Sequence, residues 1–263
     1  MQFHFISGLP RAGSSLLAAI LQQNPRFHAH IQSPVGQMIT DLHHAMSGVN
    51  EAHWFIDNDQ RLRILRGVFS AYYAENREIV FDTNRRWCAN IALVRAMFPE
   101  AWVLACVRSP VAVVDSLERL LQNHPLTLST MIGLTTNTTV FERVKRFMAP
   151  EGLVGYAWNA TQSAYYGQDR NRLIIVNYDD LARFPGKLLV EIHEKLELPA
   201  FEYDFENIEQ LSGTDLFDQS IGTPGLHSLK KRVEYLPRTS VLPPAVIASL
   251  PRPFWERNVK AEA

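Results

Sequence analysis

Residues 5–17 read Phe-Ile-Ser-Gly-Leu-Pro-Arg-Ala-Gly-Ser-Ser-Leu-Leu, and this stretch decides the fold. An apolar run stops at Gly8, a short loop that carries Arg11 follows, and an apolar segment with helical character begins at Leu16. The order strand, tight loop, helix directs several backbone N–H groups and the positive end of a helix dipole at one spot. Such a junction suits a phosphate or sulfate group.

The loop differs from a nucleotide-binding P-loop at its cation. Gly8 and Gly13 have the spacing of G-x-x-x-x-G-K-[ST], whereas Ser14 stands where that motif requires Lys. The cation is Arg11 instead, inside the loop. This exchange has to be explained before a kinase or an ATPase is assigned.

Composition limits the class of protein. The 263 residues are 46% hydrophobic with a net charge of −1, so we expect one α/β domain over residues 1–263 and no general nucleic-acid binding. Cys88 and Cys106 lie in apolar surroundings and indicate a reduced, cytoplasmic protein. The cysteines and histidines show no metal-ligand spacing, so no metal site is expected. We also expect no signal peptide and no membrane span.

Apolar strand patterns alternate with helical patterns along the chain. Strands are predicted at 2–7, 79–81, 102–107 and 173–176, and helices at 14–23, 35–48, 60–77, 88–98, 110–121, 140–148, 153–167 and 186–196. The alternation predicts a doubly wound, mostly parallel sheet flanked by helices, with ligands at the carboxyl ends of the strands. The segment at about 200–263 is expected to be loop-rich.

Polar and charged residues follow the predicted strands at that edge: Arg11, Asp82 to Arg86, Arg108 and Tyr178. Ser116 lies eight residues after Arg108, two turns into the helix that starts at Pro110. An anion along that helix would bring Arg108 and Ser116 together. The loop serves one anionic group and this pair another, which implies a ligand with two separated anionic groups.

These motifs resemble the sulfotransferases that use 3′-phosphoadenosine 5′-phosphosulfate (PAPS). The stretch from Gly8 to Ser15 is similar to their 5′-phosphosulfate loop, G-x-P-R-S-G-T-T, and Arg108 with Ser116 is similar to their 3′-phosphate site. Tyr178-Asp-Asp-Leu181 resembles the Tyr-Glu-Asp-Leu that ends their fourth strand. The likeness covers about residues 3–200. The Pro-Arg-x-Gly loop is closest to the bacterial and tyrosylprotein branch.

The resemblance implies a fold like that of the P-loop-containing nucleotide hydrolases and in-line transfer of a sulfuryl group to an acceptor hydroxyl. Adenosine 3′,5′-bisphosphate (PAP) is then the product, and Arg11 stabilises charge on the departing 5′-phosphate oxygen without a metal. The implied donor-binding residues are Pro10, Arg11, Ala12, Gly13, Ser14, Ser15, Arg108, Ser116, Tyr178, Lys230 and Lys231. The two lysines lie in the C-terminal segment, which we expect to close over the nucleotide.

Two positions depart from the family pattern. Residues 24–33, where the tyrosylprotein branch has a catalytic glutamate, contain no carboxylate, and Thr83 replaces the lysine of the family's Asp-Lys-Thr-Pro motif. Arg85 or Arg86 is expected to supply the missing catalytic charge. The general base stays unassigned, and the histidines with suitable chemistry are His28, His30, His43 and His44.

Two other functions stay open at this stage. One is a P-loop kinase of a small molecule, and the other is a non-catalytic PAP- or PAPS-binding protein with a decayed site. The acceptor is a hydroxyl compound of unknown class, with its pocket expected in segments 28–60, 122–150 and 200–235. A homodimer is compatible with the sequence, which does not decide the oligomeric state.

Overall fold

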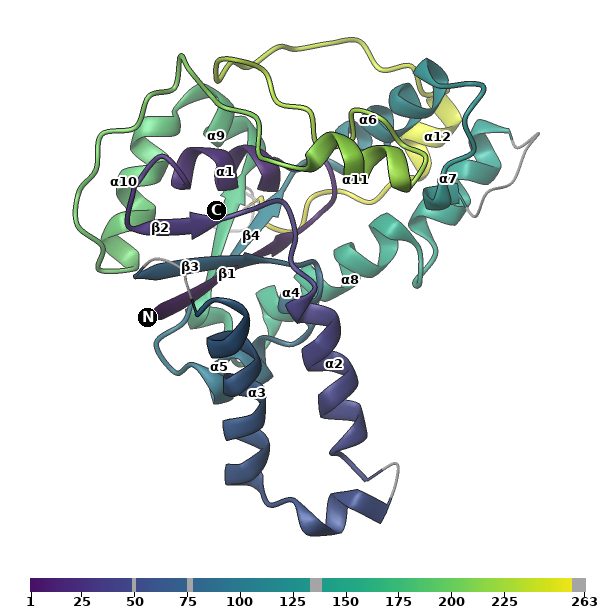
Figure 1. Ribbon diagram of the computed structural model, residues 1–263. Coiled ribbons are helices and arrows are strands. Elements are labelled where there is room, and N and C mark those ends of the chain that lie inside the picture. The colour runs from purple at the N-terminus through teal and green to yellow at the C-terminus, as the bar shows by residue number, and fades with distance from the viewer. Residues whose placement is uncertain (49–50, 75–77, 133–138, 257–263) are drawn as a thin grey trace, which may run out of the picture.

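The computed structural model describes residues 1–48, 51–74, 78–132 and 139–256 (Figure 1). Parts of the expected acceptor segments, 49–50 and 133–138, lie outside the described residues, as do 75–77 of the expected helix at 60–77. No helix in the described ranges has the length and hydropathy that a membrane crossing requires.

A parallel sheet of five strands forms the centre of the molecule. Its order is β2-β3-β1-β4-β5, and each neighbouring pair is parallel. The strands are β1 Gln2–Gly8, β2 Phe27–Ala29, β3 Ile79–Thr83, β4 Val103–Val107 and β5 Leu173–Asn177. The predicted α/β fold class, a mostly parallel sheet flanked by helices, is confirmed.

Side chains of the central strands alternate between two apolar cores. Phe3 and Phe5 of β1 pack on one face of the sheet, whereas Ile6 packs on the other. In β4, Val103 lies in the first core and Leu104 in the second. The period of two in strand geometry therefore buries an almost wholly apolar strand on both sides, as expected of a parallel sheet covered by helices.

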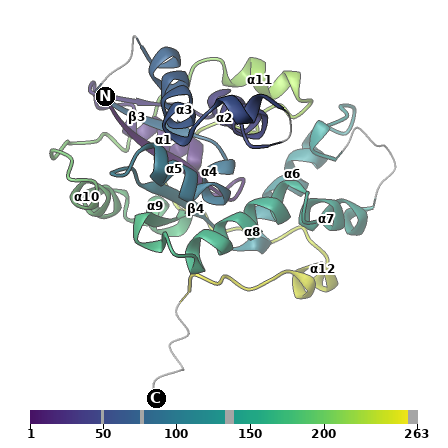
Figure 2. The ribbon, with the colours of Figure 1, turned by 90° about the horizontal axis from the view of Figure 1, so that it is seen from below.

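Helices cover both faces of the sheet (Figures 1 and 2). They are α1 Ser14–Leu21, α2 Val35–Ala45, α3 Asn58–Tyr72, α4 Arg86–Ala89, α5 Ile91–Met97, α6 Pro110–Asn123, α7 Val140–Met148, α8 Leu153–Tyr166, α9 Tyr178–Arg183, α10 Pro185–Lys195, α11 Thr214–Ser220 and α12 Pro244–Ser249. Short 3₁₀ turns lie at Glu51–Phe55, Thr130–Ile132 and Arg170–Arg172. Helices α2 and α3 project from the body as a pair, and α6, α7, α8 and α12 gather at another end.

Several elements differ from the sequence predictions. Strand β2 was not predicted, because three residues are too short for a periodic signal. The helix expected at 88–98 is two helices that meet at Asn90, whose backbone leaves the helical region. The stretch expected only to close the fourth predicted strand begins α9 instead, with Asn177 as its side-chain cap. The loop-rich C-terminal segment contains α11 and α12.

The chain order reverses on either side of β1, where β3 and β4 are its two neighbours. Ligands of doubly wound sheets bind at such a reversal, outside the carboxyl ends of the strands. At this end Gly8 has a φ of 103°, and a Cβ on Gly8 would overlap the backbone of Cys106 in β4. The Leu9 N–H donates to the Cys106 carbonyl oxygen at 2.8 Å. Only glycine fits this turn, which carries the chain from β1 into the loop.

Replacement of Gly8 by Ala should destabilise the protein by about 3 kcal/mol or more, because the new methyl group meets backbone that cannot move aside. Gly67→Ala is the matched control. Gly67 is exposed inside α3 with no atom near its missing Cβ, so alanine there should stabilise by about 0.5–1 kcal/mol. Urea unfolding of both variants measures the difference. Equal stabilities of Gly8→Ala and the wild type would contradict the close approach.

Candidate active site

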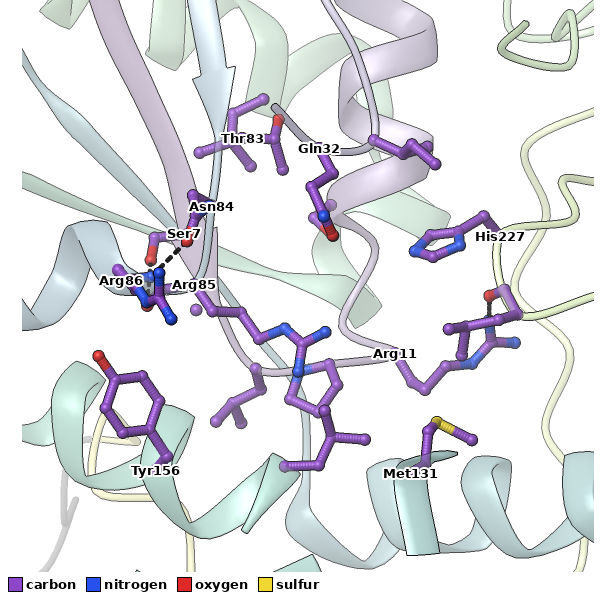
Figure 3. A pocket seen from close by; sticks show the side chains of 18 of the residues that line it. Ser7, Arg11, Gln32, Thr83, Asn84, Arg85, Arg86, Met131, Tyr156 and His227 are labelled. Carbon is purple, nitrogen blue, oxygen red and sulfur yellow. Dashed lines mark hydrogen bonds between the residues drawn. The ribbon is translucent and has the colours of Figure 1, made fainter. Parts of the chain in front are cut away.

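A cavity of about 720 Å³ opens at the carboxyl ends of β1 and β3 (Figure 3). Its wall is formed by five segments that are far apart in the chain: 6–14, 31–37, 83–86, 146–156 and 226–227, with Thr130 and Met131 beside them. Each of the three segments expected to form the acceptor pocket contributes lining residues. A smaller cavity of about 260 Å³ shares Gln32, Ser33 and Thr83 with the first.

The loop after β1 is held in an unusual backbone conformation. Arg11 has a φ of 58° and Gly13 a φ of 91°, both in the left-handed region. Gly13 caps α1 without a side-chain hydrogen bond, and the first turn of α1 contains no acidic residue. The first N–H groups of a helix have no intrahelical acceptor, so this end of α1 attracts an anion. Pro10, Arg11 and Ser14 line the cavity, whereas Ala12 is fully buried.

The side chain of Arg11 connects the loop to two distant parts of the chain. Its Nε donates to Ser116 Oγ of α6 at 3.0 Å, and its terminal nitrogen donates to the Leu226 carbonyl oxygen. A terminal nitrogen of Arg108 donates to the Arg11 carbonyl oxygen at 3.3 Å. The structure therefore brings together the residues that sequence analysis assigned to two anion positions. The two positions are adjacent, with the Arg11 side chain between them.

Arg108 lies against Tyr178 at the start of α9. The guanidinium carbon of Arg108 is 4.0 Å from the centre of the Tyr178 ring, a cation–π contact. The same ring packs on Gly13, where a Cβ would lie 2.9 Å from it. Arg108 Nε is buried without a hydrogen-bond partner among the described residues. Arg108, Ser116 and Tyr178 thus form a layer behind the loop and do not line the cavity itself.

Positive charge accumulates in this layer. Burial lowers the pKa of Arg11, and the charge of Arg108 lowers it further. Burial lowers the pKa of Arg108 as well, with Arg238 of the C-terminal segment acting in the same direction. In the described parts of the chain, none of these three arginines forms an ion pair with a carboxylate. Arg11 and Arg108 are thus desolvated cations without a bonded counter-charge, which makes this layer a candidate anion site.

Arg85 and Arg86 both line the cavity but differ in their surroundings. The Arg85 side chain extends into the cavity towards Arg11 (Figure 3) and has no hydrogen-bond or ion-pair partner among the described residues. Burial lowers the pKa of Arg85. Arg86 donates to the side-chain oxygen of Gln37. Arg85 is therefore the one of the pair whose guanidinium donors have no described partner and are available to a ligand.

Thr83, which stands at the position of the family's lysine, lines both cavities. Its Oγ1 is buried and has no hydrogen-bond partner among the described residues. The neighbouring carboxylate of Asp82 does not contact Arg85. It accepts hydrogen bonds from Ser33 Oγ at 2.5 Å, Tyr73 Oη at 2.6 Å and Trp87 Nε1 at 2.7 Å. Asp82 thus fixes the wall of the cavity from behind.

The candidate histidines of the sequence analysis do not lie in the large cavity. His28 and His30 line the smaller cavity, and His30 Nε2 is 2.9 Å from the Ser212 carbonyl oxygen. His43 and His44 are exposed on α2. The histidine that lines the large cavity is His227, which sequence analysis missed. No local motif signals it, because its partner Asp218 lies nine residues away on α11.

The two lysines of the C-terminal segment are exposed and do not line the large cavity. Lys230 is exposed and its Nζ pairs with Glu234 at 2.9 Å, and Lys231 is also exposed. The cation of this segment that acts on Arg11 and Arg108 is Arg238. Donor contacts of Lys230 and Lys231 stay a prediction, and Arg238 is an additional candidate that sequence analysis missed.

Comparison with known proteins supports one family. The profile of the sulfotransferase family matches residues 4–203. The structure is similar to the sulfotransferase domain from the curacin biosynthetic pathway, with a TM-score of 0.57 and 13% identity over 89% of this chain and 87% of that one. It is also similar to the sulfotransferase domain from the olefin synthase of Synechococcus PCC 7002, with a TM-score of 0.51 and 18% identity over 94% and 92%.

At these identities the two structures show the shared P-loop-like fold alone. No curated protein matches the sequence.

The cationic layer predicts that anions stabilise the protein. The temperature of unfolding should rise with the concentration of inorganic phosphate, and Arg108→Gln should weaken phosphate binding roughly tenfold because a charged hydrogen-bond donor is lost. Arg95→Gln is the control, since Arg95 pairs with Asp169 away from the cavity. Calorimetric unfolding at a series of phosphate concentrations measures both. The same phosphate dependence in Arg108→Gln and wild type would contradict the assignment.

Proposed function

The chain belongs to the sulfotransferase family, and on this premise we propose that it transfers a sulfuryl group from PAPS to the hydroxyl group of an acceptor. The observation that carries the proposal is a group of arginines at the loop that form no ion pair among the described residues: Arg11 in the loop, Arg108 behind it and Arg85 in the cavity. PAPS is a multiply charged anion with phosphate at the 3′ position and phosphosulfate at the 5′ position. Its two charged ends match the two adjacent anion positions.

The 5′-phosphosulfate would bind at the loop, where the first N–H groups of α1 and the side chains of Arg11 and Ser14 meet the cavity. The 3′-phosphate would bind at Arg108 and Ser116, with Arg238 contributing charge. For the 5′ assignment, the Arg11 guanidinium would have to leave the Leu226 carbonyl oxygen and Ser116 Oγ and turn to the phosphosulfate. Recognition of the 3′-phosphate would distinguish PAPS from ordinary adenylates.

In the transfer, the acceptor oxygen attacks sulfur in line with the bond to the 5′-phosphate oxygen. That bond breaks, its electron pair stays on the phosphate, and PAP leaves. Arg11 and Arg85 would stabilise the charge that develops on the departing oxygen and on the sulfuryl group. The unpartnered hydroxyl of Thr83 lies in the same cavity and offers one further donor.

Incubation with [³⁵S]PAPS and a panel of hydroxyl compounds tests the proposal: a simple alcohol, a sugar, a phenol and a tyrosine peptide. Chromatography should show labelled product together with stoichiometric PAP. Tight binding of PAP without transfer to any acceptor or to water would support the non-catalytic alternative. Magnesium-dependent turnover of ATP would support the kinase alternative.

Arg11→Ala should lower the rate of transfer about 10²–10³-fold, the usual effect of removing one donor that stabilises developing charge. Arg11→Lys should restore part of the rate, since lysine keeps the charge without the planar guanidinium. Arg108→Ala should act mainly on the KM of PAPS. Arg63→Ala, on the exposed face of α3, is the control. Steady-state kinetics separates the effects, and full activity of Arg11→Ala would refute the proposed role of the loop.

Arg85→Gln and Arg86→Gln form a second matched pair. Arg85→Gln should lower kcat about 10²-fold, because its buried guanidinium has no other partner among the described residues. Arg86→Gln should change kcat less than about threefold, because the Arg86 guanidinium is held by a hydrogen bond to the side chain of Gln37. PAP titration checks that both variants still bind the product. A larger loss of kcat in Arg86→Gln than in Arg85→Gln would instead indicate that Arg86 replaces the lysine of the family's Asp-Lys-Thr-Pro motif.

A further inference from the structure

His227 places an imidazole on the wall of the large cavity, opposite the strands. Figure 3 shows its ring directed into the space between Gln32 and Arg11. Leu226, the residue before it, accepts a hydrogen bond from the Arg11 side chain through its carbonyl oxygen. The backbone that carries His227 is therefore attached directly to the donor loop, and the imidazole shares the cavity with Pro10 and Ser14.

The carboxylate of Asp218 holds the His227 ring. Asp218 on α11 is fully buried, and its Oδ1 lies 2.5 Å from His227 Nδ1. Its Oδ2 accepts the backbone N–H of His227 at 2.8 Å. An ionised carboxylate only accepts, so Nδ1 carries the proton of this pair and Nε2 of a neutral ring presents its lone pair. No described residue occupies Nε2 with a hydrogen bond.

The charges around the ring favour its neutral form. Burial lowers the pKa of His227, and Arg11 and Arg85 lower it further, whereas Asp218 raises it. The net direction is downward from the ordinary value of a histidine. The ring is thus unprotonated near neutral pH and able to take a proton, and Asp218 stabilises the imidazolium that results.

The segment that carries the pair is well anchored. Gly222 has a φ of 67°, and a Cβ there would overlap the Leu128 carbonyl oxygen. Thr223 Oγ1 lies 2.6 Å from Ser129 Oγ, and both side chains are buried. These contacts fix the turn between α11 and His227. The position of the imidazole is therefore set by the fold and does not depend on a bound ligand.

Among the described residues that line the large cavity, the other side chain suited to accept a proton near neutral pH is Glu151. It is exposed, lies between α7 and α8, and has no hydrogen bond or ion pair with a described residue that would orient its carboxylate. His227 is buried on one side, oriented by Asp218 and adjacent to the loop. The geometry thus favours His227.

We propose that His227, oriented by Asp218, is the general base that removes the proton from the acceptor hydroxyl; the inference rests on the proposed function. The acceptor O–H bond breaks and its proton moves to Nε2 while the acceptor oxygen bonds to sulfur. The bond between sulfur and the 5′-phosphate oxygen breaks, and PAP keeps the electron pair. The imidazolium then returns its proton to water. Asp218 is a positioning residue that does not touch the acceptor.

The experiment measures [³⁵S]sulfate release from PAPS to water and transfer to the acceptor panel, so that it does not depend on knowing the natural acceptor. His227→Gln should lower both rates about 10²–10⁴-fold, the usual contribution of a general base. Its affinity for PAP should stay within about threefold of wild type. Imidazole added to His227→Ala should restore part of the rate. Asp218→Asn should also be slow, because an asparagine amide can favour the wrong tautomer of His227.

The pH dependence of kcat/KM distinguishes a general base from a residue that only supports the fold. In wild type, kcat/KM should fall as pH drops through the pKa of His227, below the ordinary range of histidine because burial, Arg11 and Arg85 outweigh Asp218. This acid limb should disappear in His227→Gln. His44→Gln, on the exposed side of α2, is the matched control and should behave as wild type.

Wild-type rate and an unchanged acid limb in His227→Gln would overturn the proposal, as would loss of activity confined to Glu151→Gln. Because Asp218 is fully buried, its replacement can also disturb folding. The rate of Asp218→Asn is therefore interpreted only if this variant still binds PAP. NMR of the wild-type imidazoles is independent of that variant: a His227 protonated at Nε2 and free at Nδ1 at pH 7 would also overturn it. An inactive wild type that binds PAP would instead contradict the proposed function, and the base assignment with it.

Discussion

The close approach between the end of β1 and the backbone of β4 is the constraint on which the site depends. Gly8 can lie against Cys106 only because it has no Cβ, and the Leu9 N–H then donates to the Cys106 carbonyl oxygen. This contact directs the loop past the carboxyl end of β4, and Arg108 is the residue that follows this strand. The left-handed conformation of Arg11 follows within the same turn. The close backbone contact of Gly8 thus brings together two arginines that follow different strands.

That layer is unfavourable for the isolated fold. Burying guanidinium groups without bonded carboxylates costs free energy, and the mutual repulsion of Arg11 and Arg108 adds to the cost. The two apolar cores on either face of the sheet offset it, since β1 and β4 contribute buried side chains to both. The apolar packing at the centre of the sheet therefore keeps the two arginines close together at its edge. An anionic ligand would reduce their repulsion.

The parts of the site that follow a strand could be predicted from the sequence, and the parts that come from later loops could not. Arg11, Arg85 and Arg108 each follow an apolar run, so the topology of a parallel sheet alone assigns them to one edge. The alternation of strands and helices predicted the fold class, and the resemblance of the motifs predicted the family; both predictions are confirmed. Arg238 and His227 lie in the segment after β5, where no periodic pattern relates chain position to place in the fold. Their proximity to the loop depends on side-chain contacts over more than two hundred residues, such as that of Arg11 with Leu226.

The same distinction applies to the proposed general base, which lies in the turn after α11 and not near the N-terminus. In-line transfer requires the base to lie on the far side of sulfur from the departing phosphate, and it does not specify which segment supplies it. In this fold the loop and α1 occupy one side of the cavity. The turn after α11 closes the cavity from another direction, tied to the loop by the Arg11 contact to Leu226 and to Asp218 by the ring of His227. The proposed base therefore does not require a carboxylate in residues 24–33. The contacts of Gly222 and Thr223 with Leu128 and Ser129 would hold its turn in place when Arg11 moves to the donor.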